Sequence, residues 1–96
     1  MSDAGWLLDE FLPRLYLWIE TEQPDDRLVN VVREWIITRY DDPYRGARRA
    51  DVAENLWFAV VPDTLRQGRV TTCSFWIYER DHIVRCDAFA SLSLPI

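Results

Sequence analysis

The chain has 96 residues, of which 49% are hydrophobic and 14% are aromatic. A chain of this length has room for one domain with a single hydrophobic core. Its formal net charge of −5 argues against a general nucleic-acid binder, because contact with phosphates needs a basic surface.

The charge is distributed unevenly along the chain. Residues 1–42 hold ten acids and four arginines, whereas residues 43–96 hold six acids and seven arginines. The acidic first part could attract a basic partner, or it could serve only to keep the protein soluble.

The sequence shows neither a secretory signal nor a membrane span. Acids stand near the N-terminus where a signal peptide carries positive charge, and the apolar runs are far below the roughly 18 residues that a span requires. Two cysteines are too few for a disulfide framework. We therefore expect a cytoplasmic protein that makes no membrane contact.

The first predicted element is a helix over residues 4–22, with Ser2 and Asp3 as candidate N-caps. Pro13 lies inside this segment and is expected to kink the helix or restart it. An alternative makes residues 14–20 a strand, because Leu, Leu and Ile alternate there. The helix is preferred because apolar residues recur at helical spacing on both sides of the proline, at Leu8, Leu12, Leu15 and Ile19.

A second helix is predicted over residues 24–41, after a short connector at residues 21–23. Pro24 and two aspartates suit its first turn, and Pro43 stops it. So short a connector predicts an αα-hairpin. The apolar stripe of this helix comprises Leu28, Val31, Val32, Trp35, Ile36 and Tyr40.

Residues 44–55 are polar and are predicted to form a loop, or a short turn of helix, that crosses to the sheet. Its three arginines, Arg45, Arg48 and Arg49, could bind phosphates or the carboxylates of a partner. The alternative is a solvated loop that pairs with the acidic helix next to it.

The segment 56–94 is predicted to form a three-stranded antiparallel sheet. β-Branched and aromatic residues favour strands at 56–61, 70–79 and 82–92, and short loops connect them as a meander. The turn of the second hairpin is expected at residues 80–81.

Strand alternation assigns the side chains of this hairpin to two faces. If Glu79 pairs with His82, an apolar face that packs on the helices carries Cys73, Phe75, Ile77, Val84, Cys86, Ala88 and Ala90. The other face carries Trp76, Tyr78, Ile83, Arg85 and Phe89, with Trp57 beside them. Two helices cover only one face of such a sheet, so the second face is predicted to be an interface. The alternative is that the N-terminal segment or the long loop covers it.

The cysteines and the single histidine are weak candidates for chemistry. Cys73 and Cys86 fall on the apolar face as diagonal neighbours, which is typical of reduced core thiols, with a redox-sensitive disulfide as the alternative. They lack the two further ligands of a closed zinc site. His82 beside Asp81 and Glu79 could act as an acid or base, but a histidine at a hairpin tip is usually only solvated.

Two helices that lead into an antiparallel meander resemble the RelE/ParE superfamily of bacterial toxins. The resemblance covers residues 24–92 and includes DPYRG after the second helix, LWFAVV as the first meander strand, and the hairpin TTCSFWIYERD and HIVRCDAFASL. It implies an αα-hairpin packed on the sheet. Nuclease members cut ribosome-bound messenger RNA with basic and aromatic residues of the sheet, whereas gyrase-poisoning members act through protein contact.

Three features differ from the family. The chain is acidic, whereas the ribosome-bound members tend to be basic. The chain ends at SLSLPI without the terminal His, Tyr or Arg expected of an RNA-cutting member. It also lacks a predicted strand ahead of the first helix, unless residues 14–20 form it.

The sequence thus predicts one α+β domain, an αα-hairpin packed on a three-stranded antiparallel β-meander. We expect a protein-binding module without enzymatic activity, metal or cofactor, of the immunity, antitoxin or ParE-like type, that binds another protein or a second copy. The alternative is a RelE-like ribonuclease in which Arg85, Tyr78, His82 and the arginine loop bind and cleave RNA. The candidate partner-binding residues are Trp76, Tyr78, Arg85, Phe89, Trp57, Arg45, Arg48 and Arg49.

Overall fold

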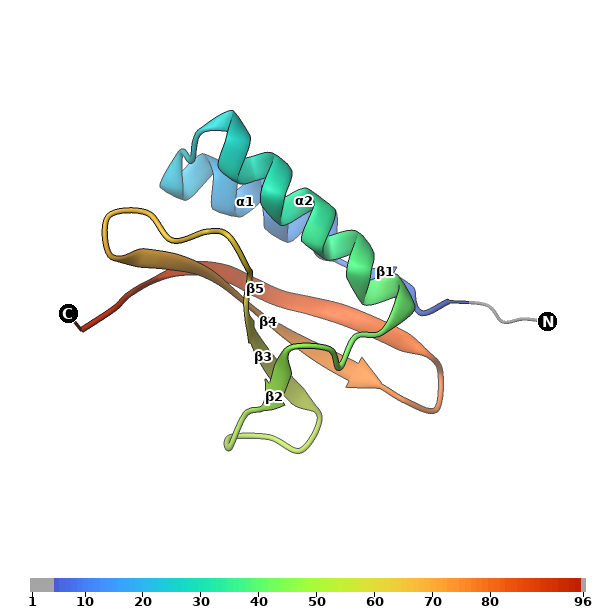
Figure 1. The fold of residues 1–96 in the computed structure, drawn as a ribbon. Coiled ribbons are helices and arrows are strands. Elements are labelled where there is room, and N and C mark those ends of the chain that lie inside the picture. Colours follow the sequence, from blue (N-terminus) through green and yellow to red (C-terminus); the bar gives the residue numbers. More distant parts are fainter. Residues whose placement is uncertain (1–4, 96) are drawn as a thin grey trace.

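A computed structural model describes residues 5–95 as two helices packed on one face of a five-stranded sheet (Figure 1). The strand order is β1-β5-β4-β3-β2, and every pair is antiparallel except β1 with β5. The elements are β1 (Leu7–Asp9), α1 (Phe11–Glu22), α2 (Asp26–Asp41), β2 (Ala47–Arg49), β3 (Leu56–Val60), β4 (Arg69–Tyr78) and β5 (Ile83–Ser93). The predicted α+β class and αα-hairpin are confirmed, but the predicted three-stranded meander is extended by a short strand at each edge.

The prediction of a helix that begins at residue 4 is wrong. Residues 7–9 form the parallel edge strand β1, and Glu10 then turns the chain into α1 with a positive φ of 66°. Pro13 falls in the first turn of α1, where backbone N–H groups have no partner within the helix, so it needs no kink. The strand alternative for residues 14–20 is also wrong, since they lie within α1. Ser2 and Asp3 lie outside the described residues.

Helix α2 agrees closely with the prediction. The side chain of Asp25 accepts a hydrogen bond from the backbone N–H of Leu28 at 2.8 Å, so this aspartate caps the helix. The buried side of the helix differs from the predicted stripe at two places, because Val29 is buried whereas Leu28 is only partly buried, and Arg39 is buried whereas Tyr40 is exposed.

Arg39 connects α2 to the following strand. Its Nη1 donates to the carbonyl oxygens of Pro43 at 3.0 Å and Arg45 at 2.9 Å, and its guanidinium carbon lies 4.4 Å from the Trp35 ring centroid. Burial lowers the pKa of this guanidinium. Arg39 therefore fixes the turn at residues 42–46. Strand β2 follows this turn, lies inside the segment 44–55 that was predicted to be a loop, and pairs with β3.

The β4–β5 hairpin contains a bulge that the sequence did not predict. Phe75 lies opposite Cys86 as expected, but the register shifts by one residue between Ser74 and Phe75. Beyond the shift Cys73 lies opposite Phe89, where the unshifted register predicted Ala88. The turn is also longer than predicted, because His82 has a positive φ of 59° and stands outside β5.

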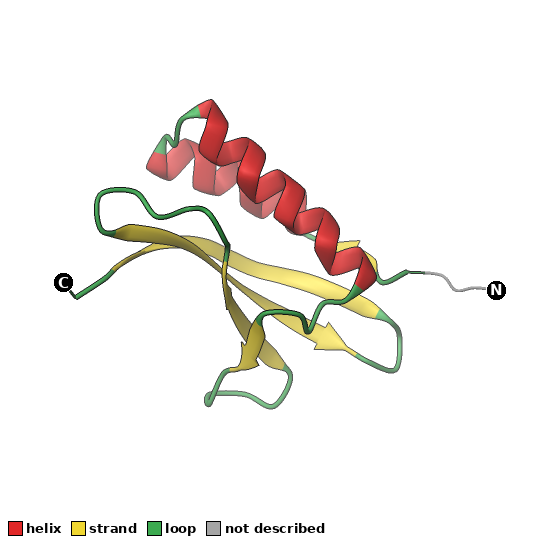
Figure 2. Cartoon of the chain, in the orientation of Figure 1, coloured by secondary structure: helices red, strands yellow, loops and turns green. Residues whose placement is uncertain are grey.

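The sheet has two very different faces. Both helices lie on the same side of it, and no other element covers the opposite side within the described chain (Figure 2). We call the covered side the helix face; its buried residues include Cys73, Phe75, Ile77, Val84 and Cys86, as predicted. We call the other side the open face; it comprises Arg48, Leu56, Phe58, Trp76, Tyr78, Ile83 and Arg85.

Candidate functional site

The open face is rich in aromatic and apolar side chains that stay in contact with solvent. Trp76, Tyr78 and Ile83 are each only partly buried, as expected for this side of the β4–β5 hairpin. Leu56 pairs with Trp76, and Phe58 pairs with Ser74, so β3 adds two more partly exposed residues to the same face. The result is an apolar surface across the three central strands.

Arg85 lies at the β1 side of this surface. Its Nε donates to the carboxylate Oδ2 of Asp9 at 2.7 Å, and its guanidinium carbon lies 5.7 Å from the Tyr78 ring centroid. The hydrogen bond from Arg85 to Asp9 and the charge of that carboxylate raise the pKa of Arg85. Asp9 was missed as a site residue because no strand was predicted where β1 forms.

The prediction that Phe89 lies on the exposed face is wrong. The bulge at residues 74–75 moves this ring to the helix face, where it is 8% exposed and its ring centroid lies 6.2 Å from that of Trp18 and 6.4 Å from that of Phe11. The same shift brings Ala88 and Ala90, which were predicted to be core residues, into contact with solvent.

Trp57 also lies on the helix face, which corrects its predicted position beside Trp76. It pairs with Phe75, so the two rings share a face, and it packs against the core from β3, the strand next to the edge strand β2. Its ring centroid lies 5.0 Å from that of Tyr44 in an edge-to-face arrangement. The residues of this strand that reach the open face are instead its neighbours Leu56 and Phe58.

The three arginines of the predicted loop do not form one cluster. Arg48 pairs with Phe58 and belongs to the open face, whereas Arg49 pairs with Trp57 and belongs to the helix face. The backbone carbonyl of Arg45 accepts a hydrogen bond from Arg39, while the Arg45 residue itself is exposed. Of the eight predicted partner-binding residues, the open face brings together Arg48, Trp76, Tyr78 and Arg85.

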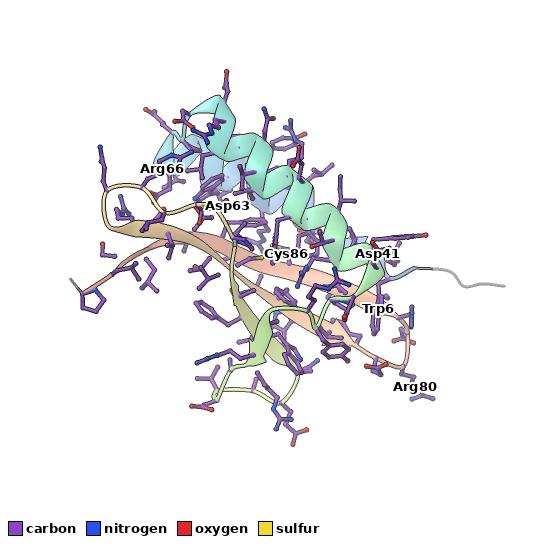
Figure 3. The ribbon with its side chains drawn as sticks, in the orientation of Figure 1. Trp6, Asp41, Asp63, Arg66, Arg80 and Cys86 are labelled. Atoms are coloured by element: carbon purple, nitrogen blue, oxygen red, sulfur yellow. The ribbon has the colours of Figure 1, made fainter. Side chains whose placement is uncertain are left out.

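His82 is part of an aromatic cluster at the turn end of the sheet. Its ring stacks on Trp6 with centroids 3.9 Å apart and an interplanar angle of 12°. Trp6 in turn contacts Tyr44, whose hydroxyl donates to the Glu79 carboxylate. Burial and this hydrogen bond raise the pKa of Tyr44 to about 12. Trp6 lies near the hairpin that carries Arg80 (Figure 3), and the stacking gives His82 a packing role.

The two cysteines are free thiols in the core. Their sulfur atoms lie 3.8 Å apart, and Cys86 sits between the helices and the sheet (Figure 3). Burial raises the pKa of Cys73 well above its ordinary value. Among residues 5–95, no group of three His, Cys, Asp or Glu side chains is placed to hold a metal ion, and no helix is long and apolar enough to cross a membrane.

Comparisons with known proteins identify the fold. No protein-family model matches the sequence, and no curated protein matches it. The structure is similar to that of a mutant of E. coli toxin RelE, with two arginines replaced by alanine, in its free state. The TM-score is 0.61 at 10% sequence identity, and the match covers 90% of this chain and 82% of RelE. The chain therefore has a RelE/ParE-like fold.

Proposed function

We propose that the chain is a toxin-type protein that acts on RNA through the open face of its sheet. The observation that carries this proposal is the combination of partly exposed rings and guanidinium groups on a sheet face that no helix within residues 5–95 covers. The likeness to RelE, a ribonuclease, supports RNA as the substrate class. The expectation of a binding module without enzymatic activity becomes the second candidate.

The side chains of the open face suit single-stranded RNA. Unpaired bases stack on aromatic rings, and the rings of Phe58, Trp76 and Tyr78 offer such surfaces on neighbouring strands. Arg48 and Arg85 flank them and would contact the phosphates. The formal charge of −5 opposes binding over the whole surface, so contact would be confined to this face.

Asp9 would have a second role on this surface. When RNA is cleaved by its own 2′-hydroxyl, the 2′-oxygen bonds to phosphorus as the bond from phosphorus to the 5′-oxygen breaks. The Asp9 carboxylate, 2.7 Å from Arg85, would accept the hydroxyl proton, and a solvent proton would go to the leaving 5′-oxygen. We expect Asp9→Asn to abolish cleavage while RNA affinity rises about twofold, because Arg85 is released from its ion pair. A gel assay of cleavage and a binding titration on the same preparation test both parts. Unchanged cleavage would exclude Asp9 as the base.

A toxin of this kind requires a partner that restrains it. RelE-like toxins bind antitoxin proteins, which supports a protein partner for this chain as well, and a cytoplasmic location would place it with its RNA substrate. The residues of the open face do not specify which protein this partner is.

Growth measurements test the proposed function directly. Expression of the chain in bacteria is expected to arrest growth, and Arg85→Ala is expected to relieve the arrest by removing a phosphate contact. Arg27→Ala is the matched control, since this exposed arginine belongs to α2, on the other side of the sheet. Equal arrest by the wild type and both variants would show that the open face does not carry the activity.

The second candidate is a protein-binding module that uses the same face without catalysis. The Asp9–Arg85 ion pair favours it, because a guanidinium already paired with a carboxylate is less available to phosphates. Tryptophan, tyrosine and arginine are also the residues that dominate protein interfaces. Here the purified protein would neither bind nor cleave RNA, and light scattering would detect a dimer or a complex with a partner that Trp76→Ala weakens.

A further inference from the structure

We infer that Asp87 determines which bases the open face prefers, by accepting hydrogen bonds from the exocyclic amino group of cytosine, adenine or guanine, so that uracil is disfavoured. This inference rests on the proposed function, because it names the class of RNA that the same face selects. It gives Asp87 a role in specificity and none in the cleavage step.

Ser74 and Asp87 add a polar pair to the open face. Ser74 pairs with Phe58 of β3, so both side chains point away from the helices. The hydroxyl of Ser74 donates a hydrogen bond to Oδ2 of Asp87 at 2.9 Å, and Asp87 is exposed. The carboxylate of Asp87 therefore lies on the open face, in contact with solvent.

The bulge in the β4–β5 hairpin creates this position. Ser74 lies opposite Ala88 and Phe75 lies opposite Cys86, so Asp87 is the extra residue of β5 and has no partner in β4. A bulge of this kind redirects the side chain that it carries. The hydrogen bond from Ser74 then holds the redirected carboxylate in place.

Two rings that would stack bases stand close to this carboxylate. Phe58 is the direct cross-strand neighbour of Ser74, and the Cβ atoms of such neighbours lie about 5 Å apart. Trp76 follows Ser74 by two residues on the same face, which places it about 7 Å along the strand. A base stacked on either ring would therefore turn an edge towards Asp87.

An ionised carboxylate selects bases that donate hydrogen bonds. It has only acceptors, and within residues 5–95 the second oxygen of Asp87, Oδ1, makes no hydrogen bond. Cytosine presents an amino group at position 4, which is a good partner for an aspartate, whereas uracil presents a carbonyl oxygen there. Two acceptors would then face each other, so the carboxylate favours cytosine over uracil.

The test compares oligocytidine with oligouridine of equal length, because the two bases have the same ring and differ at position 4. Both carry 2′-O-methyl groups, so the strand is not cleaved during the measurement. Fluorescence anisotropy of the wild type is expected to give about tenfold tighter binding of oligocytidine, since a hydrogen bond to a charged group is of that strength.

Asp87→Ala is the decisive variant. It is expected to bring the two affinities within about twofold of each other, by weakening the binding of oligocytidine. The binding of oligouridine should stay the same or rise, since a negative charge leaves the face. An unchanged ratio of the two affinities in this variant would overturn the inference.

Glu34→Ala is the matched control. It also removes an exposed carboxylate, but from α2 on the other side of the sheet, so the ratio is expected to stay as in the wild type. An equal loss of preference in Glu34→Ala and Asp87→Ala would show that overall charge sets the ratio, and would overturn the inference.

The outcomes separate this inference from the proposed function. Wild-type protein that binds neither oligonucleotide would contradict both. Wild-type protein that binds both equally well would leave the open face as an RNA-binding surface and overturn only the role of Asp87. Urea titration detects a purely structural role, because lower stability of Asp87→Ala with an unchanged ratio would assign the Ser74–Asp87 pair to the bulge alone.

Discussion

Strand β4 presents a large aromatic ring to each side of the sheet, and the two rings have opposite surroundings. Phe75 is completely buried beneath the helices, with its ring centroid 6.2 Å from that of Trp35. The next residue, Trp76, faces away from the helices and remains partly exposed. Both faces therefore carry large aromatic rings, but the two helices cover only the helix face.

This difference separates residues that stabilise the fold from residues that are available for binding. Burial of an apolar side chain contributes roughly 25 cal/mol per Å² of area removed from water. The buried rings on the helix face, such as Phe75, obtain this contribution almost in full, and those on the open face obtain only part of it. The uncovered apolar area of the open face is what a ligand could still bury.

The largest expected effect is the loss of stability in Phe75→Ala. Truncation of a buried phenylalanine typically lowers the free energy of unfolding by about 3–5 kcal/mol, because it leaves a cavity. Trp76→Ala is expected to lower it by only about 1 kcal/mol, since Trp76 is partly exposed. Urea titration of both variants measures the two values. Equal losses of unfolding free energy in the two variants would show that Trp76 stabilises the fold as much as Phe75 does.

The two cysteines test whether the helices shield the helix face from solvent. Cys73 and Cys86 are 0% and 2% exposed, and burial raises the pKa of Cys73, so little thiolate is present at neutral pH. We expect Ellman's reagent to modify them at least 100-fold more slowly in the native protein than in urea. Rapid modification of the native protein would mean that the helices do not seal this face.

The smallest expected effect concerns the cluster at the turn end of the sheet. The pKa of Tyr44 is raised from 10.0 to about 12, so its protonated hydroxyl favours the folded state fully below pH 10 and loses this contribution as the pH rises towards 12. Tyr44→Phe should therefore be less stable than the wild type by less than about 1 kcal/mol at pH 8. The difference in stability between the two proteins should narrow between pH 10 and 12, and thermal melting across this range measures it. A difference that stays constant with pH would show that the hydroxyl has no role.

Much of the helix face could be predicted from the sequence. Alternation placed Cys73, Phe75 and Ile77 in the core, and the stripe of α2 placed Val32 and Ile36 there. Both predictions depend only on local periodicity, which a regular helix or strand preserves.

The features that could not be predicted depend on contacts between distant parts of the chain. Strand β1 has three residues, and its partner β5 begins 76 residues after it, so no local pattern marks it. The bulge beside Ser74 shifts the register by one residue and moves Phe89 to the opposite face. Asp9 belongs to the candidate site because β1 pairs with β5, and Phe89 does not belong to it because of the bulge.

The proposed function requires that the open face bind RNA, and one titration tests this requirement most directly. Fluorescence anisotropy would measure the affinity of the purified chain and two variants for a single-stranded RNA oligonucleotide. Trp76→Ala should bind about tenfold or more weakly, because stacking of one base contributes roughly 1–3 kcal/mol, while Tyr16→Ala, on the exposed side of α1, should bind as the wild type does. Wild-type protein that binds no RNA, or Trp76→Ala that binds it equally well, would contradict the account.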